Sequence, residues 1–126
     1  LVDIRGIEPE SIARVATHLK NSIKKSEQDN DVSIQIREIS AEAPVKLDNE
    51  ICQCIEQHCL EQNIGYMTML SGAGHDSMNL AQKFPTAMIF TPSKNGISHH
   101  PDEFTDFDDI IIAANLLKDT LYSLAK

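Results

Sequence analysis

Two adjacent histidines, His99 and His100, stand in the stretch NGISHHPDEF, where an acidic pair follows them. Neutral imidazole binds divalent metals well, and carboxylates often orient such an imidazole from behind. A zinc site, however, needs three or four ligands that converge on one point. Local chemistry therefore leaves two interpretations open, a metal ligand in this stretch or an ordinary polar loop.

A glycine-rich stretch, SGAGHD at residues 71–76, follows a predicted strand and begins a predicted helix. Glycines let backbone N–H groups approach a ligand, and a helix N-terminus favours an anion. His75 in this stretch could donate a hydrogen bond to a carboxylate or to a developing oxyanion. The alternative is a tight turn in which His75 only caps the helix or lies exposed.

Arg5 ends the short run DIR at residues 3–5. A guanidinium can hold a carboxylate through two parallel N–H bonds. Taken alone, however, an arginine in this position is more often an ordinary surface charge, so Arg5 without other residues predicts no site.

Cys52, Cys54, His58 and Cys59 have the composition of a metal cluster but not its geometry. On a helix, residues 52 and 59 share one face, and residues 54 and 58 share another. Free cysteine is commonly a small buried hydrophobic residue. The pattern therefore favours a structural role for these side chains.

The elements that must position these residues alternate along the chain. About the first forty residues have the pattern β-α-β, with strands at 1–5 and 32–37 and a helix from Pro9 to about residue 25. From residue 49 the order becomes α-β-α-β-α, which predicts an α/β fold. Its expected parts are a helix to about 63, a strand at 66–70, a short helix ending near 84, a strand at 86–91, a loop, and a last helix started by a Thr105–Asp108 capping box.

Composition limits the function classes. With 126 residues the chain has room for one modest core, and its formal charge of −8 argues against nucleic-acid binding, which needs clustered Lys and Arg. No apolar run is long enough to predict a membrane span. Three cysteines, an odd number, make a disulfide framework unexpected and favour a cytoplasmic location. The chain starts with LVDIR, inside a strand-like run and without Met, so we expect a fragment of a longer protein.

Three stretches together resemble one enzyme family. DIR at 3–5, SGAGHD at 71–76 and MIFTPSKNGISHHPDE at 88–103 look like motifs from the C-terminal part of the allantoate amidohydrolase and N-carbamoyl-L-amino acid hydrolase family. That family belongs to the di-zinc aminopeptidase-like superfamily. The resemblance runs through essentially the whole chain, in the same order and at compatible spacing.

The resemblance implies a domain organisation. Enzymes of the family have an α/β catalytic domain into which a smaller α+β lid and dimerisation domain is inserted. On that pattern, residues 1–45 are similar to the second half of the lid, and residues 46–126 to the C-terminal segment of the catalytic domain. The polar, proline-containing stretch SAEAPVKLDNE at 40–50 lies where the chain would cross between them.

The resemblance also implies roles for single residues. In the family pattern GISHxP the first histidine is a metal ligand, which corresponds to His99, whereas His100 occupies a variable position and is not assigned. Arg5 is implied to bind the substrate carboxylate. Gly74 and His75 are implied to hold the substrate, with His75 as the catalytic group that polarises the scissile carbonyl. The family's other metal ligands and its general base have no counterpart in the sequence.

The implied function is that of a metal-dependent amidohydrolase, which cleaves the carbamoyl or ureido C–N bond of allantoate or of an N-carbamoyl-L-amino acid. Its cofactors would be two divalent metal ions, Zn or Mn, in the full-length enzyme. Its partners would be a small ureido or carbamoyl substrate with a carboxylate, and a second copy in a homodimer. We expect the chain alone to be inactive and not to hold both ions fully. Two alternatives stay open, a metallo-aminopeptidase or acylase relative and a free-standing, non-catalytic binding or assembly module.

Overall fold

A computed structural model describes residues 1–125, in which all the regular secondary structure is helical. The elements are the α-helices α1 (Pro9–Asn30), α2 (Asn49–Glu61), α3 (Asp76–Leu80) and α4 (Phe107–Leu124), and the 3-10 turn η1 (Lys94–Gly96). The chain divides into two compact units. Unit 1 consists of Leu1–Lys46 and Leu70–Gly74, and unit 2 consists of Leu47–Met69 and the residues from His75 onward.

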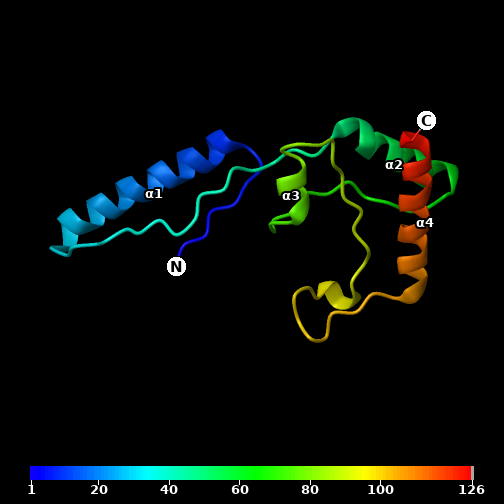
Figure 1. Ribbon diagram of the computed structural model, residues 1–126. Helices are drawn as coiled ribbons and strands as arrows, with labels where there is room; N and C mark the ends of the chain where they lie inside the picture. Colours follow the sequence, from blue (N-terminus) through cyan, green and yellow to red (C-terminus); the bar gives the residue numbers. More distant parts are fainter. Residues whose placement is uncertain (126) are drawn as a thin grey trace. The chain divides into compact units, whose positions relative to one another are not determined.

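The strands predicted at 1–5, 32–37, 66–70 and 86–91 are wrong for this structure, because no strand forms between residues 1 and 125. A strand exists only where a neighbouring strand completes its backbone hydrogen bonds. In the described part of the chain these four segments have no such neighbour. They run as extended chain outside the helices (Figure 1). Apolar side chains of 66–70 lie in solvent, as Met67 shows with 76% of its surface exposed, whereas Ala87, Met88 and Ile89 are half-buried.

Unit 1 is built on α1, which is longer than the sequence predicts. Pro9 occupies the first turn, as expected. The helix does not stop near residue 25 but continues to Asn30, whose side-chain amide donates to the Ser26 carbonyl at 2.9 Å. It ends at Asp31, which adopts a left-handed backbone with φ of 51°. The polar run SEQDND therefore extends the helix before ending it, because Glu and Gln are good helix formers.

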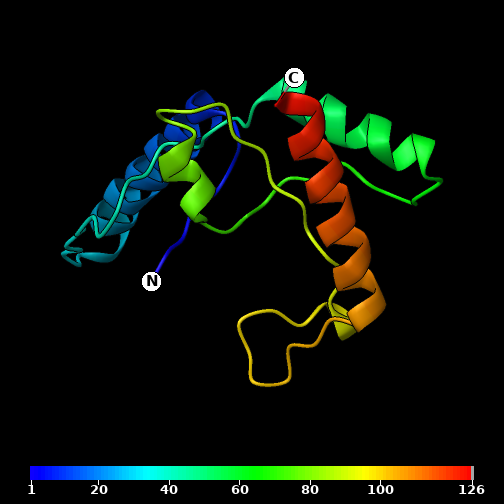
Figure 2. The same cartoon turned by 45° about the vertical axis from the view of Figure 1, so that its right-hand side comes forward.

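The segment after α1 turns back along the helix within unit 1, as Figures 1 and 2 both show. The Ile34 N–H donates to Glu27 Oε1 at 2.8 Å, and Lys46 Nζ lies 3.1 Å from Glu8 Oε1. These two contacts tie the returning segment to both ends of the helix. Four large apolar side chains in the first part of this segment are exposed, namely Val32, Ile34, Ile36 and Ile39, whereas Val45 near its end is half-buried.

In unit 2, α2 begins at a side-chain cap. Asp48 Oδ1 accepts from the Ile51 N–H at 2.9 Å, while the Asp48 N–H donates to the Thr86 carbonyl at 2.8 Å. Ser77 in α3 reaches the same apolar segment, because its Oγ lies 2.9 Å from Met88 Sδ. Residues 86–91 are thereby held between the start of α2 and α3, although they form no strand.

The packing of α2 on α4 makes the small core of unit 2. Cys59 is 2% exposed, Leu116 4% and Thr120 3%. At the edge of this contact the His58 ring lies 2.9 Å from Ser123 Oγ, and Gln62 donates to Asp119 Oδ2 at 3.0 Å. Figure 1 shows α2 passing the C-terminal end of α4, and in Figure 2 the two helices meet near that end.

The start of α4 differs from the expected Thr105–Asp108 capping box. Asp106 occupies the N-cap position, where its side chain accepts no capping hydrogen bond, and Asp108 and Asp109 lie in the first turn. These carboxylates interact favourably with the helix dipole instead. Among residues 1–125, no helix is both long enough and apolar enough to cross a membrane.

Candidate functional site

Arg5 lies in unit 1 with its guanidinium engaged on two sides. Its Nε and Nη2 lie 2.8 and 2.6 Å from Asp3 Oδ2, and its Nη1 donates to the Gly72 carbonyl at 2.5 Å. The hydrogen bond from Arg5 lowers the pKa of the Asp3 carboxyl, and the same contact raises the pKa of Arg5. Both side chains remain more than half exposed. The structure therefore brings two of the sequence motifs, DIR and SGAGHD, into direct contact.

The glycine-rich loop continues from unit 1 into unit 2, and the boundary falls between Gly74 and His75. Gly74 is exposed in irregular backbone, and His75 is the N-cap residue of α3. The side chain of His75 makes no capping hydrogen bond, which removes one of the two ordinary roles considered for it. Since α3 has only five residues, its N-terminus gives little dipole for an anion.

The half-buried His75 ring packs edge-on against Phe90, with the ring centroids 5.6 Å apart and the ring planes at 68°. This arrangement is the T-shaped geometry that aromatic pairs prefer. Phe90 lies at the end of the apolar segment 86–91, so the imidazole of His75 is held against the segment that leads to the loop with His99 and His100. The side chain of His75 is therefore positioned by packing rather than by the helix cap.

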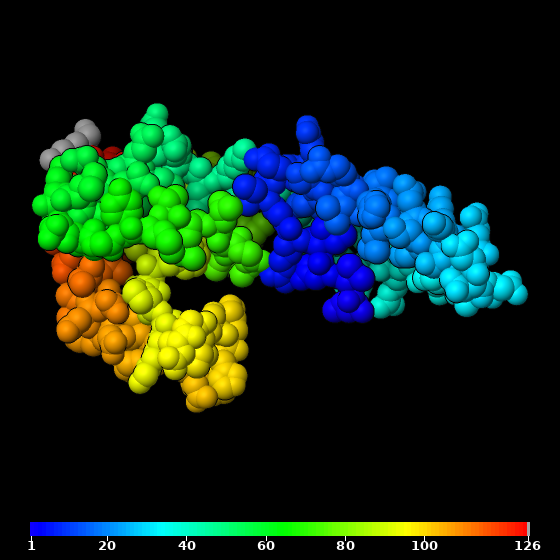
Figure 3. Space-filling model, turned by 180° about the vertical axis from the view of Figure 1, so that it is seen from behind, coloured from blue at the N-terminus to red at the C-terminus, as the bar shows by residue number. Residues whose placement is uncertain are grey.

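His99 lies in a closed loop that joins residues 86–91 to α4. The Lys94 N–H donates to the Phe104 carbonyl at 2.8 Å, which binds the two ends of the loop together, and Ser93 Oγ donates to the Ile97 carbonyl within its first turn. Figure 3 shows this segment, in yellow, projecting from the rest of its unit. Within it the His99 N–H donates to Glu103 Oε2 at 2.7 Å.

The two neighbouring histidines are held differently. His99 has a left-handed backbone with φ of 55°, a conformation that costs a residue with a side chain about 1–2 kcal/mol. Its main chain is fixed by Glu103, and the residue is exposed. The ring of His100 instead accepts from the Asp102 N–H at 3.2 Å through Nδ1. His99 therefore has the constrained backbone, whereas one ring nitrogen of His100 is already used within the loop.

The donor set suits one metal ligand and not a complete metal centre. An exposed imidazole on a fixed loop, as in His99, can ligate a divalent ion. Between residues 1 and 125, however, no three or more His, Cys, Asp or Glu side chains are grouped so that they could hold a metal ion. A hydrolytic two-metal site would therefore need ligands beyond those that residues 1–125 bring together.

The cysteine-rich helix α2 packs on α4, with Cys59 buried in the contact. Cys52, Cys54 and Cys59 are free thiols, and burial raises the pKa of Cys52 and of Cys59. A raised pKa keeps these thiols protonated and weakens them as metal ligands. His58 on the same helix faces Ser123 of α4.

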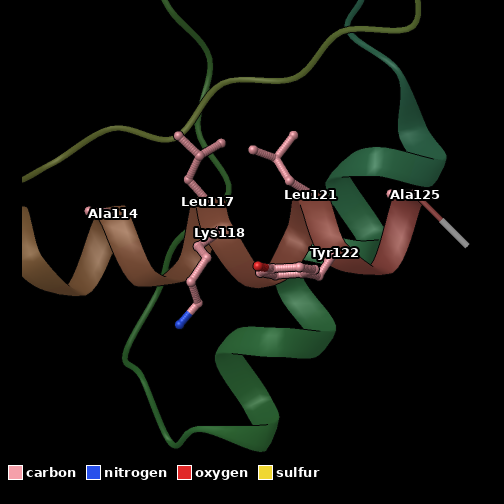
Figure 4. A pocket seen from close by; sticks show the side chains of 6 residues that line it. All are labelled: Ala114, Leu117, Lys118, Leu121, Tyr122 and Ala125. Carbon is pink, nitrogen blue, oxygen red and sulfur yellow. The ribbon is translucent and has the colours of Figure 1, made fainter.

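An apolar groove lies along the C-terminal half of α4 (Figure 4). Leu117 and Leu121, one turn apart, point to the same side of the helix there. None of the candidate residues Arg5, Gly74, His75 or His99 lines the groove. It is lined by Ala114, Leu117, Lys118, Leu121, Tyr122 and Ala125.

Sequence reasoning missed the residues that hold the candidate groups in place. Asp3 stands two positions before Arg5, the spacing that puts side chains on the same side of an extended segment, so a signal was present. Phe90 was interpreted only as part of an apolar run, although it supports the His75 ring. The contact between Arg5 and the Gly72 carbonyl spans 67 positions, and no local pattern could have revealed it.

Comparison with known proteins identifies the protein family of this chain. Residues 4–123 match the family described as Peptidase family M20/M25/M40. The chain is 34% identical, over 98% of its length, to an allantoate amidohydrolase of Escherichia coli, and 33% identical, over 95%, to an N-carbamoyl-L-amino-acid amidohydrolase of a Pseudomonas species. A crystal structure of an amidase of the hydantoinase/carbamoylase family from Burkholderia multivorans superimposes with a TM-score of 0.88 over 94% of the chain, at 27% identity.

The chain belongs to the M20/M25/M40 peptidase family, a family of hydrolases whose members typically depend on two metal ions. The predicted resemblance to allantoate and N-carbamoyl-L-amino acid amidohydrolases is confirmed. The chain spans about three tenths of the length of these relatives, 30% and 29% of the two amidohydrolases and 29% of the crystallised amidase.

Proposed function

We propose that this chain supplies part of a metal-dependent amidohydrolase that cleaves the carbamoyl or ureido C–N bond of allantoate or of an N-carbamoyl-L-amino acid. The contact between Arg5 and the Gly72 carbonyl is the observation that carries the proposal. It joins a carboxylate-binding type of side chain to the glycine loop that also contains His75. Similarity to relatives with these named activities, over nearly the whole chain, supports the same substrate class.

Each candidate residue has a role in this proposal. Arg5 binds the carboxylate that both substrate types share. Gly74 and His75 hold the carbamoyl group, and the imidazole of His75 donates to the oxygen on which charge develops during attack by water. The packing of His75 against Phe90 supports this role, because a fixed donor stabilises developing charge without reorganising first.

His99 is the proposed metal ligand of this chain. A pair of divalent ions, Zn or Mn, supplies the Lewis acidity that activates water for hydrolysis. The strained, anchored backbone of His99 supports a functional constraint at this position. Because the described residues bring together no complete ligand set, we propose that residues 1–126 alone neither hold both ions nor turn over substrate.

The domain assignment is part of the same proposal. Residues 1–45 would be the second half of a lid and dimerisation domain, and residues 46–126 the C-terminal segment of the catalytic domain. The change from unit 1 to unit 2 after Lys46 supports this boundary, although Leu70–Gly74 of the proposed catalytic segment also belongs to unit 1. The exposed apolar side chains of residues 32–39 support a homodimer or another covering surface.

The test is a substrate comparison with the whole protein supplied with Zn or Mn. An N-carbamoyl-L-amino acid or allantoate should be hydrolysed in preference to a dipeptide. His99→Ala should abolish turnover, and His100→Ala is the matched control that should retain it. A preference for the dipeptide would favour an aminopeptidase or acylase relative, and no turnover of any of these compounds would favour a binding or assembly module.

A further inference from the structure

The N–H groups of Arg5 are divided between Asp3, the Gly72 carbonyl and solvent. A guanidinium has five N–H groups. Those on Nε and on one side of Nη2 face a single oxygen of Asp3, at 2.8 and 2.6 Å, and one on Nη1 donates to the Gly72 carbonyl. Two N–H groups remain, one on each terminal nitrogen. That is the number that a carboxylate binds in a bidentate pair.

The two contacts also fix the plane of the guanidinium. Two donors on the same oxygen stop the group from rotating about its long side chain, and the Gly72 carbonyl holds its other edge. An arginine held in this way loses less rotational freedom when a ligand binds. Because the pair is more than half exposed, the remaining terminal donors are accessible to a small molecule.

We propose that Asp3 is a positioning residue that orients the Arg5 guanidinium to bind the substrate carboxylate. The Gly72 carbonyl then fixes the position of this guanidinium relative to the glycine-rich loop. The inference rests on the proposed function and names the feature of the substrate that is selected: a planar, charged carboxylate rather than a neutral carboxamide. The lowered pKa of Asp3 agrees with it, because both partners stay charged around neutral pH.

The experiment compares N-carbamoyl-L-alanine with its neutral carboxamide in the whole protein loaded with metal. Asp3→Ala should raise KM for the acid roughly tenfold, the effect of losing an ordering charged hydrogen bond, and should leave kcat/KM for the carboxamide within about twofold. Asp3→Glu, which keeps the charge, should recover part of the loss. Glu8→Ala is the control, because Glu8 is a similarly exposed carboxylate in the same unit that pairs with Lys46 instead.

The possible failures are distinguishable. If the unmodified protein hydrolyses the acid and Asp3→Ala leaves its KM unchanged, or weakens acid and carboxamide equally, the positioning role is wrong and the proposed function stands. If the unmodified protein hydrolyses neither compound nor allantoate, both are wrong.

A second measurement covers an Asp3→Ala protein that folds poorly. In the 126-residue chain the Nε–H resonance of Arg5 should exchange slowly with water, and Asp3→Asn should speed that exchange. Exchange as fast as in a free arginine, in the unmodified chain, would overturn the inference.

Discussion

Leu116 is the side chain whose removal should most weaken unit 2. It is 4% exposed in the contact of α2 with α4, where the only other apolar side chain buried to this degree in the described residues is Cys59. Leu116→Ala removes three carbon groups, about 2.4 kcal/mol of transfer free energy at about 0.8 kcal/mol each. A cavity that cannot close fully adds to this, and the total should be about 3 kcal/mol.

Hydrogen exchange can measure this loss where it occurs. A loss of about 3 kcal/mol lowers the protection of amides in α2 and α4 on the order of a hundredfold, because each 1.4 kcal/mol is a factor of ten. Amides of α1 serve as the internal reference, since α1 belongs to the other compact unit.

Leu117→Ala is the matched control, the same substitution one position along the same helix. Leu117 is 51% exposed, so its removal should cost about 1 kcal/mol or less. Equal loss of protection in the two variants would refute the reasoning, because the α2–α4 contact would then not be what stabilises these helices.

Three further outcomes follow from charge and exposure. The hydrogen bond from Lys118, and after it that from Gln62, lowers the pKa of the Asp119 carboxyl below its ordinary 3.8. The carboxylate therefore stabilises the fold fully above pH 3.8, and this stabilisation is lost as pH falls through the lower pKa of the folded state. Asp119→Asn should reduce the loss of unfolding free energy in acid, and an unchanged acid dependence would contradict this. Burial raises the pKa of the Cys59 thiol above its ordinary 9.0. The stabilisation that the neutral thiol gives is therefore complete below pH 9.0 and is lost as pH rises through the higher pKa of the folded state. Cys59→Ser should remove this loss of stability in alkali. Both units expose large apolar side chains, such as Ile39 at 71% in unit 1 and Met67 at 76% in unit 2, so the chain should self-associate at micromolar concentrations, and a single monomer species in sedimentation would contradict this.

The helices were predictable because their signals are local. Pro9 marks the start of α1, where its missing N–H needs no partner, and Asp48 caps α2 by accepting from the Ile51 N–H in the first turn. The strands were not, because an alternating apolar pattern predicts a strand only if another segment completes its hydrogen bonds. For residues 32–37 and 86–91 no such segment lies within the described chain.

The candidate site was predictable only in part, for a related reason. Local chemistry could not separate His99 from His100, since the two differ in backbone conformation and in what binds them, not in residue type. Nor could it assign Arg5 a role, because the Gly72 carbonyl that it contacts is distant in sequence. Family resemblance supplied these assignments, and the contacts of His99 and Arg5 now give them a physical basis to test.

The most direct test of the account is the metal stoichiometry of the 126-residue chain, measured by equilibrium dialysis against Mn²⁺, which binds oxygen and imidazole ligands rather than thiols. A chain that supplies a single ligand, His99, should hold no Mn²⁺ tightly, and any weak binding should fall in His99→Ala. Two tightly bound ions per chain, unaffected by His99→Ala, would contradict the claim that this chain supplies one part of a two-metal centre.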